Sequence, residues 1–87
     1  MKIKEGFILK EVVGTYIVVA VNDAVKKFNG VINLNETGAF LWSVLEKGAT
    51  EEELVSALLQ EYEVDEERAK LDVNKFVNNL KEANLVE

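Results

Sequence analysis

The sequence predicts an α+β fold of the winged helix-turn-helix type, in which a three-stranded antiparallel N-terminal sheet precedes three helices. Up to residue 34, the apolar residues alternate with polar ones or form short β-branched blocks, as strands do. From Glu36 onward they recur at helical spacing. Asn35 stands at the change, where its side-chain oxygen can cap a helix. A length of 87 residues predicts a single domain, residues 1–87.

The expected strands cover residues 7–12, 15–21 and 31–34. Val13 and Gly14 separate the first two strands, a length suited to a tight hairpin. Asn29 and Gly30 form a strong turn signal before the third strand, because both tolerate positive φ. Residues 24–28 carry no clear pattern.

The first expected helix runs from residue 36 to residue 47 and ends at Gly48, which suits a left-handed C-terminus. Gly38 is unusual inside a helix, because it costs about 0.5–1 kcal/mol relative to alanine. We therefore expect another group to pack close to its backbone. The expected apolar stripe lies at helical spacing, with Trp42 on its flank; it comprises Phe40, Leu41, Val44 and Leu45.

Two more helices follow. Thr50 with Glu53 has the spacing of a capping box and starts the second helix. Asp65 caps the third, residues 66–83, in which Leu71 lies opposite the core stripe and should be exposed. Asn84 is a plausible turn residue, and residues 85–86 fold back after it. The core stripe of the third helix comprises Ala69, Val73, Phe76, Leu80 and Ala83.

The composition excludes several functions. The chain has no cysteine and no histidine, which removes disulfides, thiol nucleophiles and nearly every zinc site. A net charge of −6 argues against general nucleic-acid binding. No apolar run approaches the roughly 20 residues that span a bilayer, and the N-terminus lacks a signal-peptide core. We expect a cytoplasmic protein that acts on no membrane, holds no metal or other cofactor and is not an enzyme.

Three binding roles remain. The basic residues of the third helix could favour a winged-helix DNA-binding regulator, but its first turn is acidic. An acidic scaffold that binds a protein partner is another. The third is peptide binding, because a short sheet leaves an edge that can accept a further strand. Residues 31–34 could form such an edge, or could be an ordinary core strand.

Residues 34–42, LNETGAFLW, resemble the hallmark of the PqqD-like family, the relatives of pyrroloquinoline-quinone synthesis protein D that are also called RiPP recognition elements. Residues 50–55, 62–65 and 72–86 resemble the family's second helix start, its short turn and its third helix with its exit. The resemblance covers about residues 28–86. Residues 1–27 match the quinone-pathway members poorly, so the resemblance supports the broader recognition-element class.

The resemblance implies that the chain binds the leader segment of a ribosomally made precursor peptide as a strand added beside residues 31–34 and against the third helix. It also implies delivery to a modifying enzyme, often a radical S-adenosylmethionine enzyme. No nucleic acid takes part. Because a free edge can also pair with a second copy, the chain could be a monomer or a homodimer.

By position, the resemblance places the peptide backbone along Val31, Ile32, Asn33 and Leu34. A flank of the third helix would complete the site, and the helical wheel offers two. One flank carries Arg68, Asp72, Lys75 and Asn79; the other carries Lys70, Val77 and Lys81. We favour the first, because Asp72 and Lys75 could pair with leader charges while Phe76 supplies an apolar floor.

Overall fold

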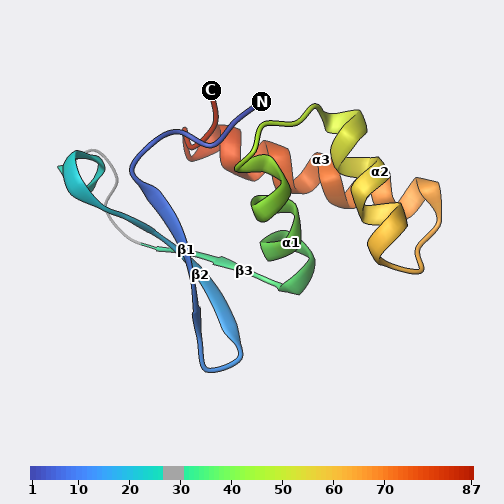
Figure 1. The fold of residues 1–87 in the computed structure, drawn as a ribbon, viewed down its shortest axis with the longest axis horizontal. Coiled ribbons are helices and arrows are strands. Elements are labelled where there is room, and N and C mark those ends of the chain that lie inside the picture. The colour runs from blue at the N-terminus through green and yellow to red at the C-terminus, as the bar shows by residue number, and fades with distance from the viewer. Residues whose placement is uncertain (27–30) are drawn as a thin grey trace.

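A three-stranded antiparallel sheet precedes three α-helices, as predicted (Figure 1). The computed structural model describes residues 1–26 and 31–87. The predicted turn at Asn29 and Gly30 lies outside the described residues. The strands follow one another in the order β1-β2-β3, and the helices lie to one side of the sheet (Figure 1). The elements are β1 (Phe7–Val12), β2 (Thr15–Ala20), the 3₁₀ helix η1 (Asn22–Lys26), β3 (Ile32–Leu34), α1 (Glu36–Leu45), α2 (Glu51–Glu61) and α3 (Glu66–Glu82).

The hairpin between β1 and β2 is as tight as predicted. Val13 and Gly14 both adopt left-handed backbone conformations, with φ of 37° and 78°. Two such residues form the turn whose twist matches that of paired strands. Thr15 adds a hydrogen bond from its Oγ1 to the carbonyl oxygen of Val12, at 2.7 Å. β2 and β3 are each one residue shorter than predicted.

The three predicted N-caps are confirmed. Asn35 accepts a hydrogen bond from the Gly38 amide at 2.7 Å, and Asp65 accepts one from the amide of Arg68 at 2.8 Å. Thr50 and Glu53 form the complete capping box, with bonds of 3.1 and 3.0 Å. Each bond satisfies an amide that the first turn of a helix leaves without a partner.

The helix ends follow the glycine and asparagine signals. Gly48 and Asn84 have φ of 87° and 62°, as expected for residues that stop a helix. α1 ends at Leu45, two residues before the predicted end, because its last turn tightens: the amide of Gly48 donates to the Leu45 carbonyl at 2.9 Å.

The hydrophobic core lies between the sheet and the helices. The predicted α3 stripe is buried from Ala69 to Leu80, and Leu71 is 54% exposed as expected. Two predictions about the core are wrong. Trp42, placed on a flank of α1, is wholly buried, and Phe40 is only partly buried. Val77, placed on a flank of α3, is also wholly buried and belongs to the hydrophobic core.

The sequence pattern did not predict how the two ends of the chain meet. Ile3 and Val86 form an antiparallel bridge, and the amide of Lys4 donates to the Leu85 carbonyl at 2.9 Å. The N and C labels accordingly lie close together in Figure 1. No helix within residues 1–26 and 31–87 is long and apolar enough to cross a membrane.

Candidate functional site: a groove between β3 and α3

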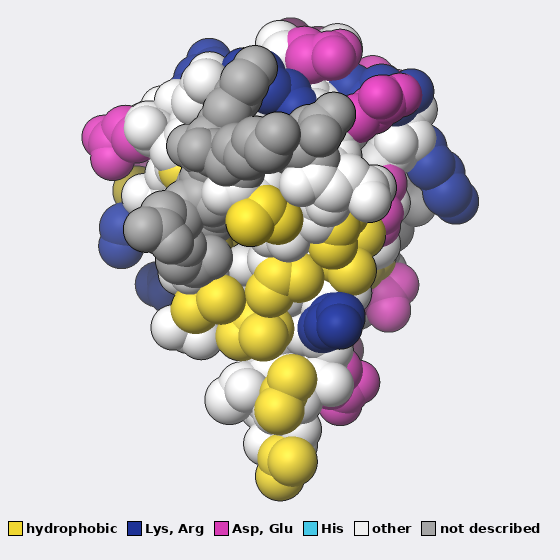
Figure 2. All heavy atoms as spheres, turned by 90° about the vertical axis from the view of Figure 1, so that its left-hand side faces the viewer, with side chains coloured by type: hydrophobic (Ala, Val, Ile, Leu, Met, Phe, Trp, Pro, Cys, Tyr) yellow, Lys and Arg dark blue, Asp and Glu magenta, His cyan; other side chains and the backbone are white. Residues whose placement is uncertain are grey.

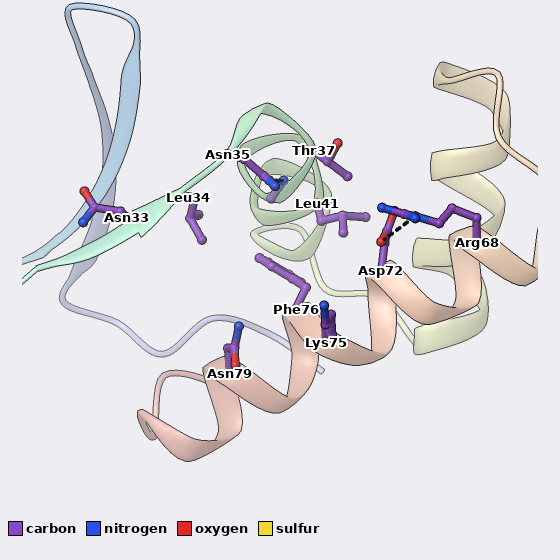
Figure 3. Close-up of a pocket in the computed structure, with 11 residues that line it drawn as sticks. Asn33, Leu34, Asn35, Thr37, Leu41, Arg68, Asp72, Lys75, Phe76 and Asn79 are labelled. Carbon is purple, nitrogen blue, oxygen red and sulfur yellow. Dashed lines mark hydrogen bonds and ion pairs between the residues drawn. The ribbon is translucent and has the colours of Figure 1, made fainter.

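A groove of about 340 Å³ runs between the β3–α1 junction and α3. It brings together two of the four strand residues named from the sequence, Asn33 and Leu34, with the four residues of the favoured flank of α3 and with Phe76. Val31 and Ile32 are not part of its lining. The full lining comprises Asn33, Leu34, Asn35, Thr37, Gly38, Leu41, Arg68, Asp72, Lys75, Phe76 and Asn79 (Figure 3).

The backbone of β3 presents one residue to its open edge. Just after β2, the amide of Val21 donates to the carbonyl of Gly6 at 2.7 Å. The backbone N–H and C=O groups of the odd-numbered residues of β2 therefore point toward β1. The direction of these backbone groups alternates along a strand. The backbone N–H and C=O groups of Tyr16 and Val18 therefore point toward β3, where their partners are Leu34 and Ile32. Asn33, paired with Ile17, lies between these bonded pairs. Its N–H and C=O therefore point away from β2, toward the open edge.

That edge is free in the part of the chain that the structure describes, since β3 is the last strand in the sheet order. An open edge carries unpaired amide and carbonyl groups, which can bond a further strand. The side chain of Asn33 points away from the groove (Figure 3). The contribution of Asn33 to the groove is therefore chiefly its backbone.

The floor of the groove is apolar. Phe76 extends from α3 toward α1 and Leu34, beside Leu41 (Figure 3). Phe76 and Leu41 are buried, whereas Leu34 is half-buried. Gly38 lets Leu34 lie close to α1, because a Cβ at Gly38 would come within 3.4 Å of the Leu34 side chain. This contact confirms the expectation of close packing at the Gly38 backbone.

Most of the sequence matches the model of one protein family. The model of the family described as "Coenzyme PQQ synthesis protein D (PqqD)" matches residues 9–86. The chain belongs to the PqqD family. This confirms the resemblance drawn from residues 34–42.

Two solved structures are similar to this PqqD-family chain over nearly its whole length. "TbiB1 in Complex with the TbiA(beta) Leader Peptide" is 26% identical, with a TM-score of 0.77, covering 100% of this chain and 95% of that one. "Lasso peptide synthetase B1 complexed with the leader peptide" is 20% identical, with a TM-score of 0.75 and coverages of 99% and 95%; it supports the fold alone. None of the curated proteins matches the sequence.

The charged wall of the groove in this PqqD-family protein comes from α3. Nε of Arg68 lies 3.2 Å from Oδ1 of Asp72, one helical turn away, so these two charges largely satisfy each other. Lys75 forms no ion pair within residues 1–26 and 31–87. The three side chains sum to a charge of +1, in a chain whose net charge is −6. The groove is thus more positive than the protein as a whole.

The alternative flank of α3 does not line this groove. Lys70 pairs with Glu66 at 3.4 Å and lines a separate hollow beside α2. Val77 is in the core. Lys81 lies in the last turn of α3 and is exposed.

Four groove residues were absent from the predicted site: Asn35, Thr37, Gly38 and Leu41. All four lie in the segment LNETGAFLW, which the sequence analysis interpreted as a helix start. Three lie in the cap and first turn of α1, which follows β3 without a loop, so the groove wall continues from the strand into the helix. The family motif was therefore the available signal for them. Among the described residues, no group of three or more Asp or Glu side chains is placed to hold a metal ion.

Proposed function

We propose that this protein binds the leader segment of a ribosomally synthesised precursor peptide as a fourth strand on β3. The observation that carries the proposal is the outward-facing backbone of Asn33, at an open edge beside a groove with an apolar floor. Main-chain bonds to an edge give a strand ligand affinity, and pockets for alternate side chains give specificity. The leader-peptide complex of the 26% identical TbiB1 supports this assignment.

The peptide would lie along residues 31–34, with alternate side chains directed to the apolar floor at Phe76. Arg68, Asp72, Lys75 and Asn79 form the opposite wall, where charges on the leader can pair with them. The chain acts as a single non-catalytic binding domain and needs no cofactor of its own. The acidic first turn of α3 disfavours the alternative, a winged-helix regulator that inserts α3 into DNA.

A second part of the proposal concerns the partner. The domain delivers the bound leader to a separate modifying enzyme in the cytoplasm. The family resemblance implies that this enzyme is often a radical S-adenosylmethionine enzyme. This class can be tested on the enzyme encoded beside this gene.

The test is an NMR titration of the ¹⁵N-labelled protein with synthetic leader peptides taken from short reading frames beside its gene. We expect amide shifts concentrated in residues 31–38 and on the Arg68–Asn79 flank of α3. Duplex DNA is titrated in parallel. Shifts in α3 with DNA, weakened strongly by salt, and none with any leader would overturn the proposal in favour of the regulator.

A further inference from the structure

The face of the sheet that points away from the helices is apolar. Side chains alternate between the two faces of a strand, and Val18 is wholly buried, so the even-numbered residues of β2 face the core. The register then places the remaining residues on the opposite side. We call this surface the outer face: Ile8, Lys10 and Val12 of β1, Thr15, Ile17 and Val19 of β2, Asn33 of β3, and Val31 just before β3.

The outer face is partly exposed in the described part of the chain: Ile17 and Val19 are half-buried, and three other apolar side chains are exposed. Ile8 is 38% exposed, Val12 47% and Val31 56%. Figure 2 views the molecule from this side: hydrophobic side chains gather over the middle and continue to the hairpin tip, while acidic side chains lie toward the rim. The largest apolar patch on the surface of a monomeric protein is often a functional surface.

The charge of the outer face differs from that of the protein. Lys10 is its one charged side chain among the described strand residues, and none is a carboxylate. The whole chain, by contrast, carries 16 acidic residues and a net charge of −6. A complementary surface would be apolar with a carboxylate opposite Lys10. If a second copy of the protein packed against this face, the only charged side chain that it would bring is another Lys10, which cannot form an ion pair with the first.

The outer face alone is smaller than a stable interface. Two strands of six residues and β3 with three residues, at about 4.8 Å per strand and 3.4 Å per residue, give an area of roughly 250 Å². A stable interface buries about 800 Å² on each partner. A partner must therefore extend beyond the sheet, over the protruding hairpin or over a neighbouring strand.

A leader strand on β3 would be that neighbouring strand. It would widen the sheet by about 4.8 Å, or a third. Every second side chain of the leader would then lie on the outer face, next to Val31 and Asn33. This step rests on the proposed function.

We propose that the outer face is the docking surface for the modifying enzyme, which contacts it with an apolar surface carrying at least one carboxylate opposite Lys10. The bound leader completes this surface. The enzyme therefore binds the leader-loaded domain more tightly than the free domain.

The test compares outer-face variants with matched controls elsewhere. Ile8→Asp and Lys10→Glu alter the outer face on β1, the strand farthest from β3. Leu71→Asp and Lys47→Glu make the same two changes at exposed positions outside it. Val12→Asp replaces Ile8→Asp if that variant does not fold. The probe is the purified modifying enzyme encoded beside the gene, with its affinity measured with and without leader peptide.

We expect the outer-face variants to weaken enzyme binding by at least about tenfold, because an unpaired or repelled charge is expensive in an interface. Leader binding should change less than about twofold in every variant, and the two controls should bind the enzyme as the original protein does. Unchanged enzyme binding in folded outer-face variants would overturn the proposal. So would failure of the original protein to bind the enzyme in either state.

Two further outcomes separate the possible explanations. A homodimer in analytical ultracentrifugation that Ile8→Asp dissociates would identify the outer face as a self-interface and overturn the enzyme as its occupant. Failure of the original protein to bind any leader would refute the proposed function. In that case, enzyme binding that depends on Ile8 and Lys10 would still support the outer face as a docking surface.

Discussion

Proline at Asn33 should weaken leader binding while leaving the fold intact. The Asn33 amide points to the open edge of β3 and bonds nothing in β2, so its removal breaks no hydrogen bond of the sheet. Proline is tolerated in edge strands for this reason. The same amide is the donor that β3 offers to an incoming strand. Asn33→Pro therefore separates binding from folding in a way that a change at Ile32 or Leu34 cannot.

The expected magnitude follows from that single bond. A hydrogen bond contributes about 0.5–1.5 kcal/mol net, which corresponds to roughly 2- to 13-fold in affinity. The proline ring also occupies the space where the carbonyl of the leader strand would approach Asn33. We therefore expect the affinity for the leader to fall by at least about tenfold.

The assay is fluorescence anisotropy with a labelled leader peptide. Asn33→Ala is the matched control, because it removes the side chain and keeps the amide; its affinity should stay within about twofold of the original. Folding is checked in urea by the emission of Trp42, the single tryptophan of the chain, which is wholly buried. If folded Asn33→Pro binds the leader as well as Asn33→Ala does, the β3 edge is not the peptide site.

Three other predictions concern the cap, the charged wall and alkaline stability. Asn35→Ala should destabilise the protein by about 1 kcal/mol, because it leaves the buried amide of Gly38 without a hydrogen-bond acceptor. The melting temperature should fall by roughly 4–8 °C. Asn35→Asp, which keeps the acceptor, should not show this fall. Lys75→Glu should weaken binding of leaders with an acidic residue at that wall by about fivefold at low salt, and the difference should shrink as salt rises; an effect independent of salt would contradict this role. Burial, with a contribution from Glu36, raises the pKa of Tyr62 above 10.0. As the pH rises, the unfolded chain therefore releases the Tyr62 proton at a lower pH than the folded protein does. The free energy of unfolding should fall as the pH rises through about 10. Tyr62→Phe should flatten that fall in urea denaturation between about pH 9 and pH 11, and an equally steep fall in the variant would refute the assignment.

The sequence predicted best what is decided within a few residues. Each N-cap needs only a short polar side chain three positions before the amide that it accepts from, so Asn35, Thr50 and Asp65 could be identified from the sequence alone. Val13 and Gly14 likewise define their hairpin by length and backbone preference. These signals do not depend on what packs against the element.

The wrong predictions concern contacts that only the tertiary structure decides. In α1, residues 38, 41, 42 and 45 form one helical stripe, and residues 40, 41, 44 and 45 form another. Because α1 is apolar almost all round, periodicity does not choose between them. The structure buries the first stripe, and the bare backbone of Gly38 was the sign that this side lies in close contact. The pairing of Ile3 with Val86 had no local signal at all.

The position of β3 explains how one short strand can serve the core, the leader and a partner. Ile32 and Leu34 face the core, Asn33 directs its backbone to the open edge, and its side chain joins the outer face. If the enzyme binds the leader-loaded domain more tightly by some factor, thermodynamic linkage requires the leader to bind the enzyme-bound domain more tightly by the same factor. The two factors come from separate titrations, one of enzyme into loaded and free domain, the other of leader into the domain with and without enzyme. Equal factors above one would mean that the bound leader completes the enzyme's docking surface. A factor of one in both titrations would mean that the groove and the outer face act independently, although they share β3.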